Sequence, residues 1–323
     1  MSPAPRDDGF EWSSARRDGW PRKALLLVNR QGTRGRSRLD DGVRSLHQAG
    51  IEATPEMPHE PGRIPARIRD GAAGCDMIVL GGGDGTLSHA LDAILATGLP
   101  LGVLPMGNAN DLARTLNIPT DPQAACRIIA EGNTRPIDVG RIERADSAPT
   151  HFFNVASIGL SVRIARRLTR RRKERYGPLA YLACTWEAIH RQRAFAVRIT
   201  CDGVTTELTS MQVAIGNGRY YGGGMTIVDD AAIDDGRLDL YALPQLPGWR
   251  LAALLPVLRW GWHRPIDNIL SLRGREITVD TDRPLRINVD GEVRGRTPAL
   301  FRVIPRALRV FAPPTPLPPH AEN

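Results

Sequence analysis

A short apolar segment followed by a cluster of glycines constrains the fold of this chain more than any other feature. Residues 77–80 are all apolar, and the next six residues are four glycines together with Asp84 and Thr86. A short apolar run rich in branched residues predicts a buried parallel strand, and the glycines predict a turn that needs residues without a Cβ atom. Apolar residues then recur at helical spacing from Leu87 to Leu95. The sequence therefore predicts a strand, a glycine loop and a helix start in direct succession.

The chemistry of this loop indicates phosphate binding. The first N–H groups of a helix have no intrahelical partner, and the positive end of the helix dipole favours an anion. Asp84 lies among these N–H groups, where a carboxylate makes sense if it holds a metal ion or a hydroxyl. The loop thus suggests nucleotide-dependent phosphoryl transfer, although it matches neither a Walker A loop nor Gly-x-Gly-x-x-Gly. The alternative is a packing turn in which Asp84 only caps the helix.

The composition limits the class of protein but does not identify its binding partner. A chain of 323 residues is long for one hydrophobic core and suits two domains of a soluble protein. The formal net charge of +8 favours nucleic acid, an anionic membrane or an anionic metabolite. The four cysteines are scattered without a C-x-x-C pair, so a reducing cytoplasm is expected. No segment reaches the ~18 to 20 apolar residues of a membrane span, so any membrane contact is expected to be peripheral.

The first half of the chain alternates between strand and helix patterns. Strand patterns occur at residues 24–28, 51–54, 77–80 and 100–105, with helical patterns between and after them. This alternation predicts a parallel sheet whose ligands bind at the carboxyl ends of the strands. We therefore expect a nucleotide-binding α/β domain at residues 22–142, preceded by a flexible leader at residues 1–21.

The pattern changes near residue 140, where helices become rarer and alternating segments predict strands. The expected strands are residues 152–155, 196–201, 206–214, 237–243, 276–279, 285–289 and 307–311, and helical patterns cover residues 160–190 and 249–262. We predict an antiparallel, β-sandwich-like domain at residues 143–312, followed by a disordered Pro-rich tail at residues 313–323. The fold class is therefore α/β plus β.

Five motifs in a fixed order carry a resemblance to a known family. They lie at residues 82–86, 105–114, 216–225, 234–239 and 289–292. With these motifs the chain resembles the diacylglycerol kinase catalytic-domain family of bacterial soluble lipid kinases, from Lys23 to Phe311. The second motif matches the family's Pro-x-Gly-Thr-x-Asn-Asp-x-Ala-Arg, with Asn108 where threonine is usual. The first motif alone is shared with NAD kinases and phosphofructokinases, so the order of the motifs carries the resemblance.

The resemblance implies ATP and magnesium in a cleft between the two domains. It implies that the nucleotide is held by Asn29, Thr54, Gly82, Gly83, Asp84, Gly85, Thr86, Leu87, Ser88, Gly107, Asn108 and Asn110. By the same resemblance, Asp84 and Asp111 organise the catalytic magnesium and the phosphates. A structural magnesium would be held by the Asp235 carboxylate and the carbonyl oxygens of Ala232 and Arg237. Without the family, a hairpin turn is the preferred interpretation of residues 234–236.

Glu292 is the residue that the resemblance implies as the general base. Attack of an alcohol on a γ-phosphoryl group needs a carboxylate within reach of the hydroxyl proton. The alternative is that Asp290 and Gly291 form a type I′ turn, which makes Glu292 a surface strand residue.

A basic segment provides the candidate for membrane contact. It begins at Arg163 and ends at Lys173, with its charges broken by small and apolar residues. It is either an amphipathic helix that docks on anionic lipid or a solvated helix face. It has no interleaved aromatic residues, so binding of single-stranded nucleic acid is not expected. The oligomeric state is not readable from the sequence, and a homodimer is one possible assembly.

Three functional classes remain open from the sequence. The leading one is an ATP-dependent kinase of a lipid hydroxyl, acting on diacylglycerol, a glycerophospholipid headgroup or a sphingoid base. A second is a relative of NAD kinase that acts on a soluble substrate. A third is a nucleotide-binding and membrane-binding regulatory module without turnover. The departures from the family at Asn108 and Asp229 keep the third class open, whereas retention of Asp84, Asp111 and Glu292 counts against it.

Overall fold

The computed structural model describes residues 22–29, 36–58, 60–160, 162, 194–221, 225–226, 231–245 and 269–314. Several predictions of the sequence fall outside these residues. They are the leader at 1–21, the basic segment at 163–173, nearly all of the helical patterns at 160–190 and 249–262, Asp229 and the tail from 315.

A parallel sheet of four strands forms the first part of the chain, as predicted. The strands are β1 Arg22–Val28, β2 Ile51–Glu56, β3 Met77–Gly82 and β4 Leu101–Pro105. Their order across the sheet is β2-β1-β3-β4, with every neighbouring pair parallel. All five residues of β4 and all six of β3 are buried, which explains their continuous apolar pattern.

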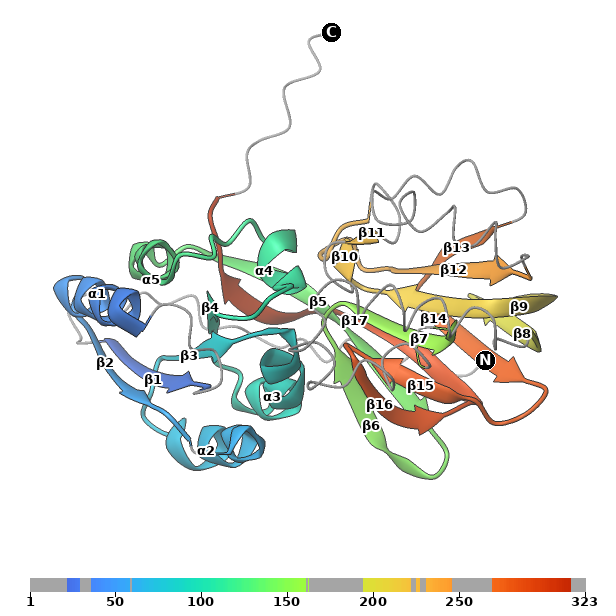
Figure 1. Cartoon of the computed structure of the whole chain (residues 1–323), viewed down its shortest axis with the longest axis horizontal. Helices are drawn as coiled ribbons and strands as arrows, with labels where there is room; N and C mark the ends of the chain where they lie inside the picture. The colour runs from blue at the N-terminus through green and yellow to red at the C-terminus, as the bar shows by residue number, and fades with distance from the viewer. Residues whose placement is uncertain are drawn as a thin grey trace, which may run out of the picture.

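Helices cover both faces of this sheet. They are α1 Arg36–Gln48, α2 Ile64–Gly71 with the short η1 Pro61–Arg63 before it, α3 Asp84–Thr97, α4 Asp111–Thr115 and α5 Pro122–Glu131. Helices α1 and α5 lie on one face, and α2 and α3 lie on the other (Figure 1). Residues next to helix α5 cap both of its ends. The Asp121 side chain accepts a hydrogen bond from Ala124 N at 3.0 Å at the N-terminus, and Gly132 ends the helix in a left-handed conformation.

Antiparallel strands dominate the rest of the described chain, as predicted. They are β5 Thr134–Arg144, β6 Ser147–Phe152, β7 Val155–Gly159, β8 Phe195–Cys201, β9 Val204–Gly216, β10 Tyr220–Tyr221, β11 Met225–Thr226, β12 Leu238–Pro244, β13 Leu270–Gly274, β14 Glu276–Thr281, β15 Arg286–Val289, β16 Glu292–Arg296 and β17 Ala299–Phe311. Their apolar inner faces form a second hydrophobic core that contains Phe152, Phe195 and Phe301. The predicted strand at residues 152–155 is wrong, because Phe153 and Asn154 separate β6 from β7.

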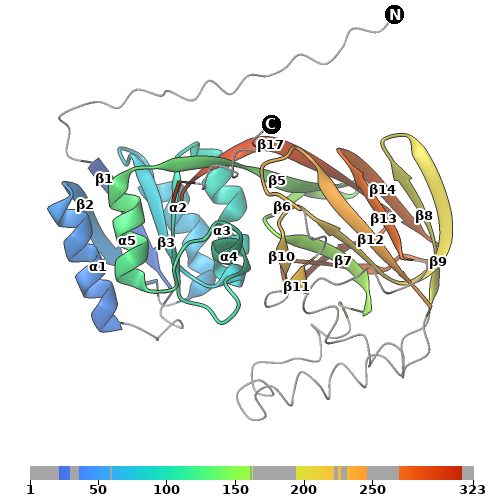
Figure 2. The same ribbon diagram turned by 90° about the horizontal axis from the view of Figure 1, so that it is seen from above.

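Strand β17 joins the two cores. It pairs with β14 near its start, with β5 along most of its length, and in parallel with β4 through Val310 and Leu101. Figure 2 shows β5 and β17 running side by side from one part of the molecule to the other. Leu308 and Val310 belong to the first core, whereas Phe301 belongs to the second. The last described strand therefore returns to the parallel sheet that the first four described strands build.

Among the described residues, no helix is long and apolar enough to cross a membrane.

Cys126 in α5 is expected to resist alkylation in the folded protein. Burial raises the pKa of its thiol from about 9 to about 12, which lowers the thiolate fraction at pH 8 by about a thousandfold. Cys75 is only half-buried and serves as the comparison. Timed iodoacetamide labelling with peptide mapping should modify Cys75 first and Cys126 only on unfolding. Equal labelling rates at the two positions would contradict the burial of Cys126.

Candidate active site

Two loops meet at the carboxyl ends of the central strands β3 and β4. The Met106 N–H donates to the Gly82 carbonyl oxygen at 2.9 Å, just where both strands end. A Cβ atom added to Gly107 would lie 2.5 Å from the Gly83 Cα atom. This is closer than any real Cβ contact, so the two loop backbones approach to a distance that only glycine permits. The loops predicted from separate motifs therefore form one surface.

Substituting Gly107 with alanine is expected to push these loops apart. The new methyl group would meet the backbone of Gly83, which has no flexible atom to move. We expect a loss of about 1–3 kcal/mol in unfolding free energy from the forced shift. Thermal or denaturant unfolding measures it. Gly62→Ala is the matched control, because a Cβ atom there meets nothing within 4 Å. An unfolding free energy for Gly107→Ala equal to that of the control would contradict the close approach.

Asp84 is the first residue of α3, but its carboxylate does not cap that helix. The N-cap residue is Gly83, and Asp84 Oδ1 instead accepts a long hydrogen bond of 3.4 Å from Leu112 N in the second loop's helix. Burial raises the pKa of Asp84, while backbone N–H groups of Leu112 and its neighbours act in the opposite direction. The alternative in which Asp84 serves only as a cap of its own helix is therefore not favoured.

Asn110 and Asp111 shape the second loop. Asn110 has a positive φ of 52°, and its side chain both accepts from Gly107 N at 2.9 Å and donates to Gly107 O at 3.0 Å. Asp111 follows as the first residue of α4 and is buried. Asn108 is exposed at the tip of the loop. Asn110 therefore bonds within its own loop, whereas Asn108 is the loop side chain that faces outward.

The remaining predicted nucleotide contacts differ in position. Asn29, directly after β1, donates from Nδ2 to Thr86 Oγ1 at 2.8 Å, which ties the end of β1 to the glycine loop. Leu87 and Ser88 are buried, so their side chains face the interior. Thr54 lies level with Ile78 in the strand register, four residues before Gly82. That offset corresponds to about 13 Å along a strand, so the structure does not bring Thr54 to the loops.

Glu292 stands on a hairpin beside α3. Asp290 and Gly291 both have positive φ, 46° and 96°, and form the two-residue turn between β15 and β16. The Glu292 side chain is 48% exposed, and Arg294 Nη2 donates to its Oε2 at 2.8 Å. The same Arg294 Nη2 lies 3.4 Å from Nδ1 of His89 in α3. The turn interpretation is thus correct as structure, and the turn also brings Glu292 beside the helix that begins at Asp84.

Asp290 belongs to the fifth family motif, but the sequence assigns it no role beyond the turn. Its carboxylate accepts hydrogen bonds from the N–H groups of Phe153 at 2.8 Å, Asn154 at 3.0 Å and Val155 at 3.0 Å. Burial raises the pKa of Asp290 to about 6 against these donors, and the charge of Asp84 contributes to the rise. No local signal could have revealed this contact, because its partners lie more than a hundred positions earlier in the chain.

The predicted structural metal ligands lie around a turn that a buried carboxylate holds. Asp138 accepts from Gly236 N at 2.6 Å and from Arg306 N at 2.7 Å. Asp235 accepts from Arg237 N at 3.0 Å, and burial raises its pKa, with the charge of Asp239 adding to the rise. In the described part of the chain, no three acidic, histidine or cysteine residues cluster as a metal site. A site built from one carboxylate and backbone carbonyls, as the resemblance implies, does not need such a cluster.

The loop junction suits phosphates and a divalent cation. Glycine at positions 83 and 107 exposes backbone instead of side chains at the contact of the loops. Asp84 and Asp290 lie close enough for their charges to interact. Asp84 and Asp111 bring carboxylate oxygens to the first positions of α3 and α4, and oxygen ligands are those that magnesium prefers.

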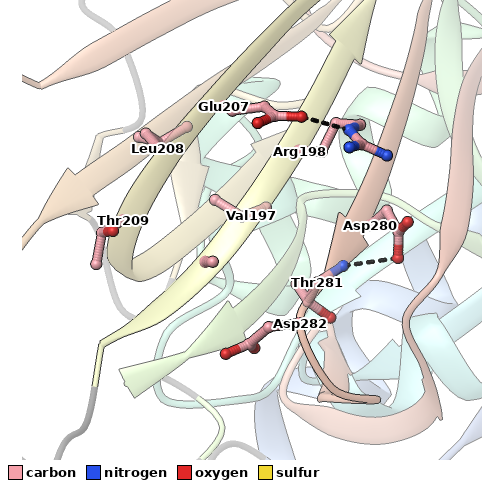
Figure 3. Close-up of a pocket in the computed structure, with 9 residues that line it drawn as sticks. Val197, Arg198, Glu207, Leu208, Thr209, Asp280, Thr281 and Asp282 are labelled. Atoms are coloured by element: carbon pink, nitrogen blue, oxygen red, sulfur yellow. Dashed lines mark hydrogen bonds and ion pairs between the residues drawn. The ribbon is translucent and has the colours of Figure 1, made fainter.

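A separate pocket lies elsewhere in the molecule. It has a volume of about 460 Å³ and is lined by residues of β8, β9 and β14 and of the turn after β14, including the Arg198–Glu207 ion pair and Asp280 (Figure 3). None of the predicted site residues lines it. The candidate active site is therefore the loop junction and not this pocket.

Comparisons with known proteins identify the class and then the family. Residues 23–142 match the diacylglycerol kinase catalytic domain, and residues 154–312 match the YegS C-terminal NAD kinase beta sandwich-like domain. A parallel α/β domain with these loops, followed by a sandwich-like domain, defines a two-domain kinase.

Relatives across most of the chain place it within that class. A protein named "Diacylglycerol kinase" from Mycobacterium tuberculosis is 32% identical over 75% of this chain and 78% of its own length. A protein named "Probable lipid kinase YegS-like" from Xanthomonas oryzae pv. oryzae is 32% identical over 89% of this chain and 95% of its own length. The chain belongs to this diacylglycerol kinase and YegS-like lipid kinase family, and the predicted resemblance is confirmed.

A solved structure agrees on the fold. The crystal structure of a diacylglycerol kinase from Bacillus anthracis str. Sterne superposes with a TM-score of 0.72, covering 90% of this chain and 97% of that one. At 22% sequence identity this likeness speaks for the fold alone.

Proposed function

We propose that this protein transfers the γ-phosphoryl group of ATP, with magnesium, to a hydroxyl of diacylglycerol or a related membrane lipid. The observation that carries the proposal is the contact of Gly83 with Gly107, which joins the two family loops at the start of α3 beside Asp84. The names of the relatives support a lipid as the substrate.

The residues take roles that follow from their positions. Backbone N–H groups of the glycine loop and the N-terminus of α3 bind the phosphates of the nucleotide. Asp84 and Asp111 hold magnesium, which when bound offsets the charge of the transferring phosphoryl group. Asn29 keeps Thr86 and the loop in place through its 2.8 Å hydrogen bond. Ala232, Asp235 and Arg237 hold a second, structural magnesium in this proposal.

Glu292 accepts the proton of the lipid hydroxyl while the hydroxyl oxygen attacks the γ-phosphorus of ATP. Arg294 Nε and Nη2 both donate to Oε2 of Glu292, at 3.2 and 2.8 Å. The other carboxylate oxygen, Oε1, is then the atom that receives the proton. Arg294 fixes the side chain without occupying both oxygens, which suits a base that must meet an incoming hydroxyl.

The lipid is reached from a membrane surface in this proposal. The segment from Arg163 to Lys173 supplies the basic contact with anionic lipid, as its sequence predicts. Incubation with γ-labelled ATP, magnesium and a total lipid extract tests the function. We expect label in the organic phase, and its mobility begins to name the lipid. Label that stays wholly in the aqueous phase would favour the soluble-substrate or regulatory classes.

A further inference from the structure

Two hairpin turns in the sandwich-like part share one design. Asp202 and Gly203 link β8 to β9, and Asp290 and Gly291 link β15 to β16, with the aspartate at φ 46° in both turns. In each turn the aspartate carboxylate accepts backbone N–H groups from another strand segment. Asp202 accepts from Arg275 and Glu276, with its shortest contact at 2.9 Å.

The Asp290 turn differs from the Asp202 turn in the residue that follows it and in the segment to which its carboxylate is hydrogen-bonded. Glu292 follows two residues later, on the edge strand β16, whose only sheet neighbour among the described strands is β15. The segment bound by Asp290, Phe153 to Val155, is itself well anchored. Asn217 Nδ2 donates to Phe153 O at 2.9 Å and to Asp138 O at 2.9 Å. A short edge hairpin is thus fixed to a buried, hydrogen-bonded part of the molecule.

Asp290 binds the segment from Phe153 to Val155 through both its side chain and its backbone. The three N–H donors reach both carboxylate oxygens, Oδ2 from Phe153 and Oδ1 from Asn154 and Val155. The Asp290 N–H in turn donates to Val155 O at 2.9 Å. Hydrogen bonds to a carboxylate are stronger than those between neutral groups, so this set opposes fraying of the hairpin tip.

We propose that Asp290 is the positioning residue for Glu292. Its hydrogen bonds hold the tip of the β15–β16 hairpin where Glu292 faces the glycine loop at the start of α3. This inference rests on the proposed function, in which Glu292 is the base. Displacing a reacting group by about 1 Å can lower a rate about 100-fold. Asp290 itself acts through Glu292 and needs no contact with the substrate.

Asp290→Asn is the variant that isolates this role. Asparagine tolerates the left-handed conformation, so the turn is kept. One carboxylate oxygen becomes an NH₂ group, which faces an N–H donor instead of accepting from it. Asp202→Asn makes the same change in the matched turn. The Asp202 turn is far from the segment that Asp290 binds. It lies at the start of β9, whereas Gly216, which pairs with Val155, lies at the end of β9. The two points are about 40 Å apart along the strand.

The experiment is a double-mutant cycle measured as kcat for lipid phosphorylation, with ATP affinity and thermal unfolding alongside. We expect Asp290→Asn to lower kcat about 100-fold in the native background and less than about threefold in the Glu292→Gln background. Its ATP affinity should stay unchanged. Asp202→Asn should leave kcat within about twofold in both backgrounds. If Asp290→Asn does not fold, Asp290→Glu, which keeps the charge but moves it by one methylene, enters the same cycle with the same expectation.

The outcomes separate this inference from the function on which it rests. An equal loss of kcat in both backgrounds, or full kcat in Asp290→Asn, would overturn the positioning role alone. A native protein that phosphorylates no lipid would overturn the proposed function and the positioning role with it.

Discussion

Replacing Glu292 with glutamine is expected to lower kcat for lipid phosphorylation by about 10²–10⁴-fold, the usual contribution of a positioned general base. Glutamine keeps the shape of the side chain and can still accept from Arg294, but it cannot take up the hydroxyl proton. Because the side chain is about half exposed, unfolding free energy should change by less than about 0.5 kcal/mol. ATP affinity should be unchanged, since the proposed nucleotide contacts lie on other loops. Labelled-phosphate transfer and nucleotide titration measure both quantities.

Glu276→Gln is the matched control for this prediction. Glu276 is 50% exposed on strand β14 and pairs with Arg302 at 2.8 Å, so its surroundings resemble those of Glu292. It lies outside the proposed site, and kcat should be that of the native protein. A Glu292→Gln variant as active as this control would remove Glu292 from the mechanism and revive its interpretation as a surface strand residue.

Replacing Asp84 with asparagine is expected to lower kcat by about 100-fold or more without lowering the melting temperature. The loss of activity follows from removing a charge that holds magnesium against the transferring phosphate. Stability should be kept or should rise, because burial raises the pKa of Asp84 and so its ionised form destabilises the fold at neutral pH. Asparagine Oδ1 can still accept from Leu112 N. Steady-state kinetics over a magnesium series and thermal unfolding measure the two effects.

Asp92→Asn is the control within the same helix. Asp92 lies two turns further along α3, where its carboxylate contacts His151 Nδ1 at 2.7 Å, away from the glycine loop. Its kcat should be native. Full activity in Asp84→Asn would exclude Asp84 from the site. A fall in melting temperature that accounts for the lost activity would make Asp84 a structural residue.

Local patterns explain why much of the fold could be predicted. The apolar run before Gly81 and the helical spacing after it depend only on neighbouring residues, and they predict strand β3 and the body of helix α3, although α3 already begins at Asp84. The same holds for β1, β4 and the antiparallel character of the later segments. The family motifs added which loops belong together, and the closeness of Gly83 and Gly107 shows their meeting point.

Long-range contacts explain what could not be predicted. The break between β6 and β7 exists because the N–H groups of Phe153 and Asn154 donate to the Asp290 carboxylate instead of to a neighbouring strand. No residue pattern near position 153 indicates this contact. Strand β17 was predicted only from residue 307, whereas it begins at Ala299 and returns to β4. The register of β2 depends on its partner strand in the same way: Thr54 lies level with Leu25, two residues before β2 ends at Glu56, and its nucleotide contact stays a prediction.

Direct detection of the product tests whether the protein phosphorylates a lipid. The protein is incubated with ATP and magnesium, in one reaction with diacylglycerol in mixed micelles and in another with NAD, and the products are identified by mass spectrometry. We expect phosphatidic acid in the first reaction, absent when Glu292→Gln replaces the native protein, and no phosphorylated dinucleotide in the second. Phosphorylated NAD without phosphatidic acid would contradict this expectation and assign the chain to the soluble-substrate class.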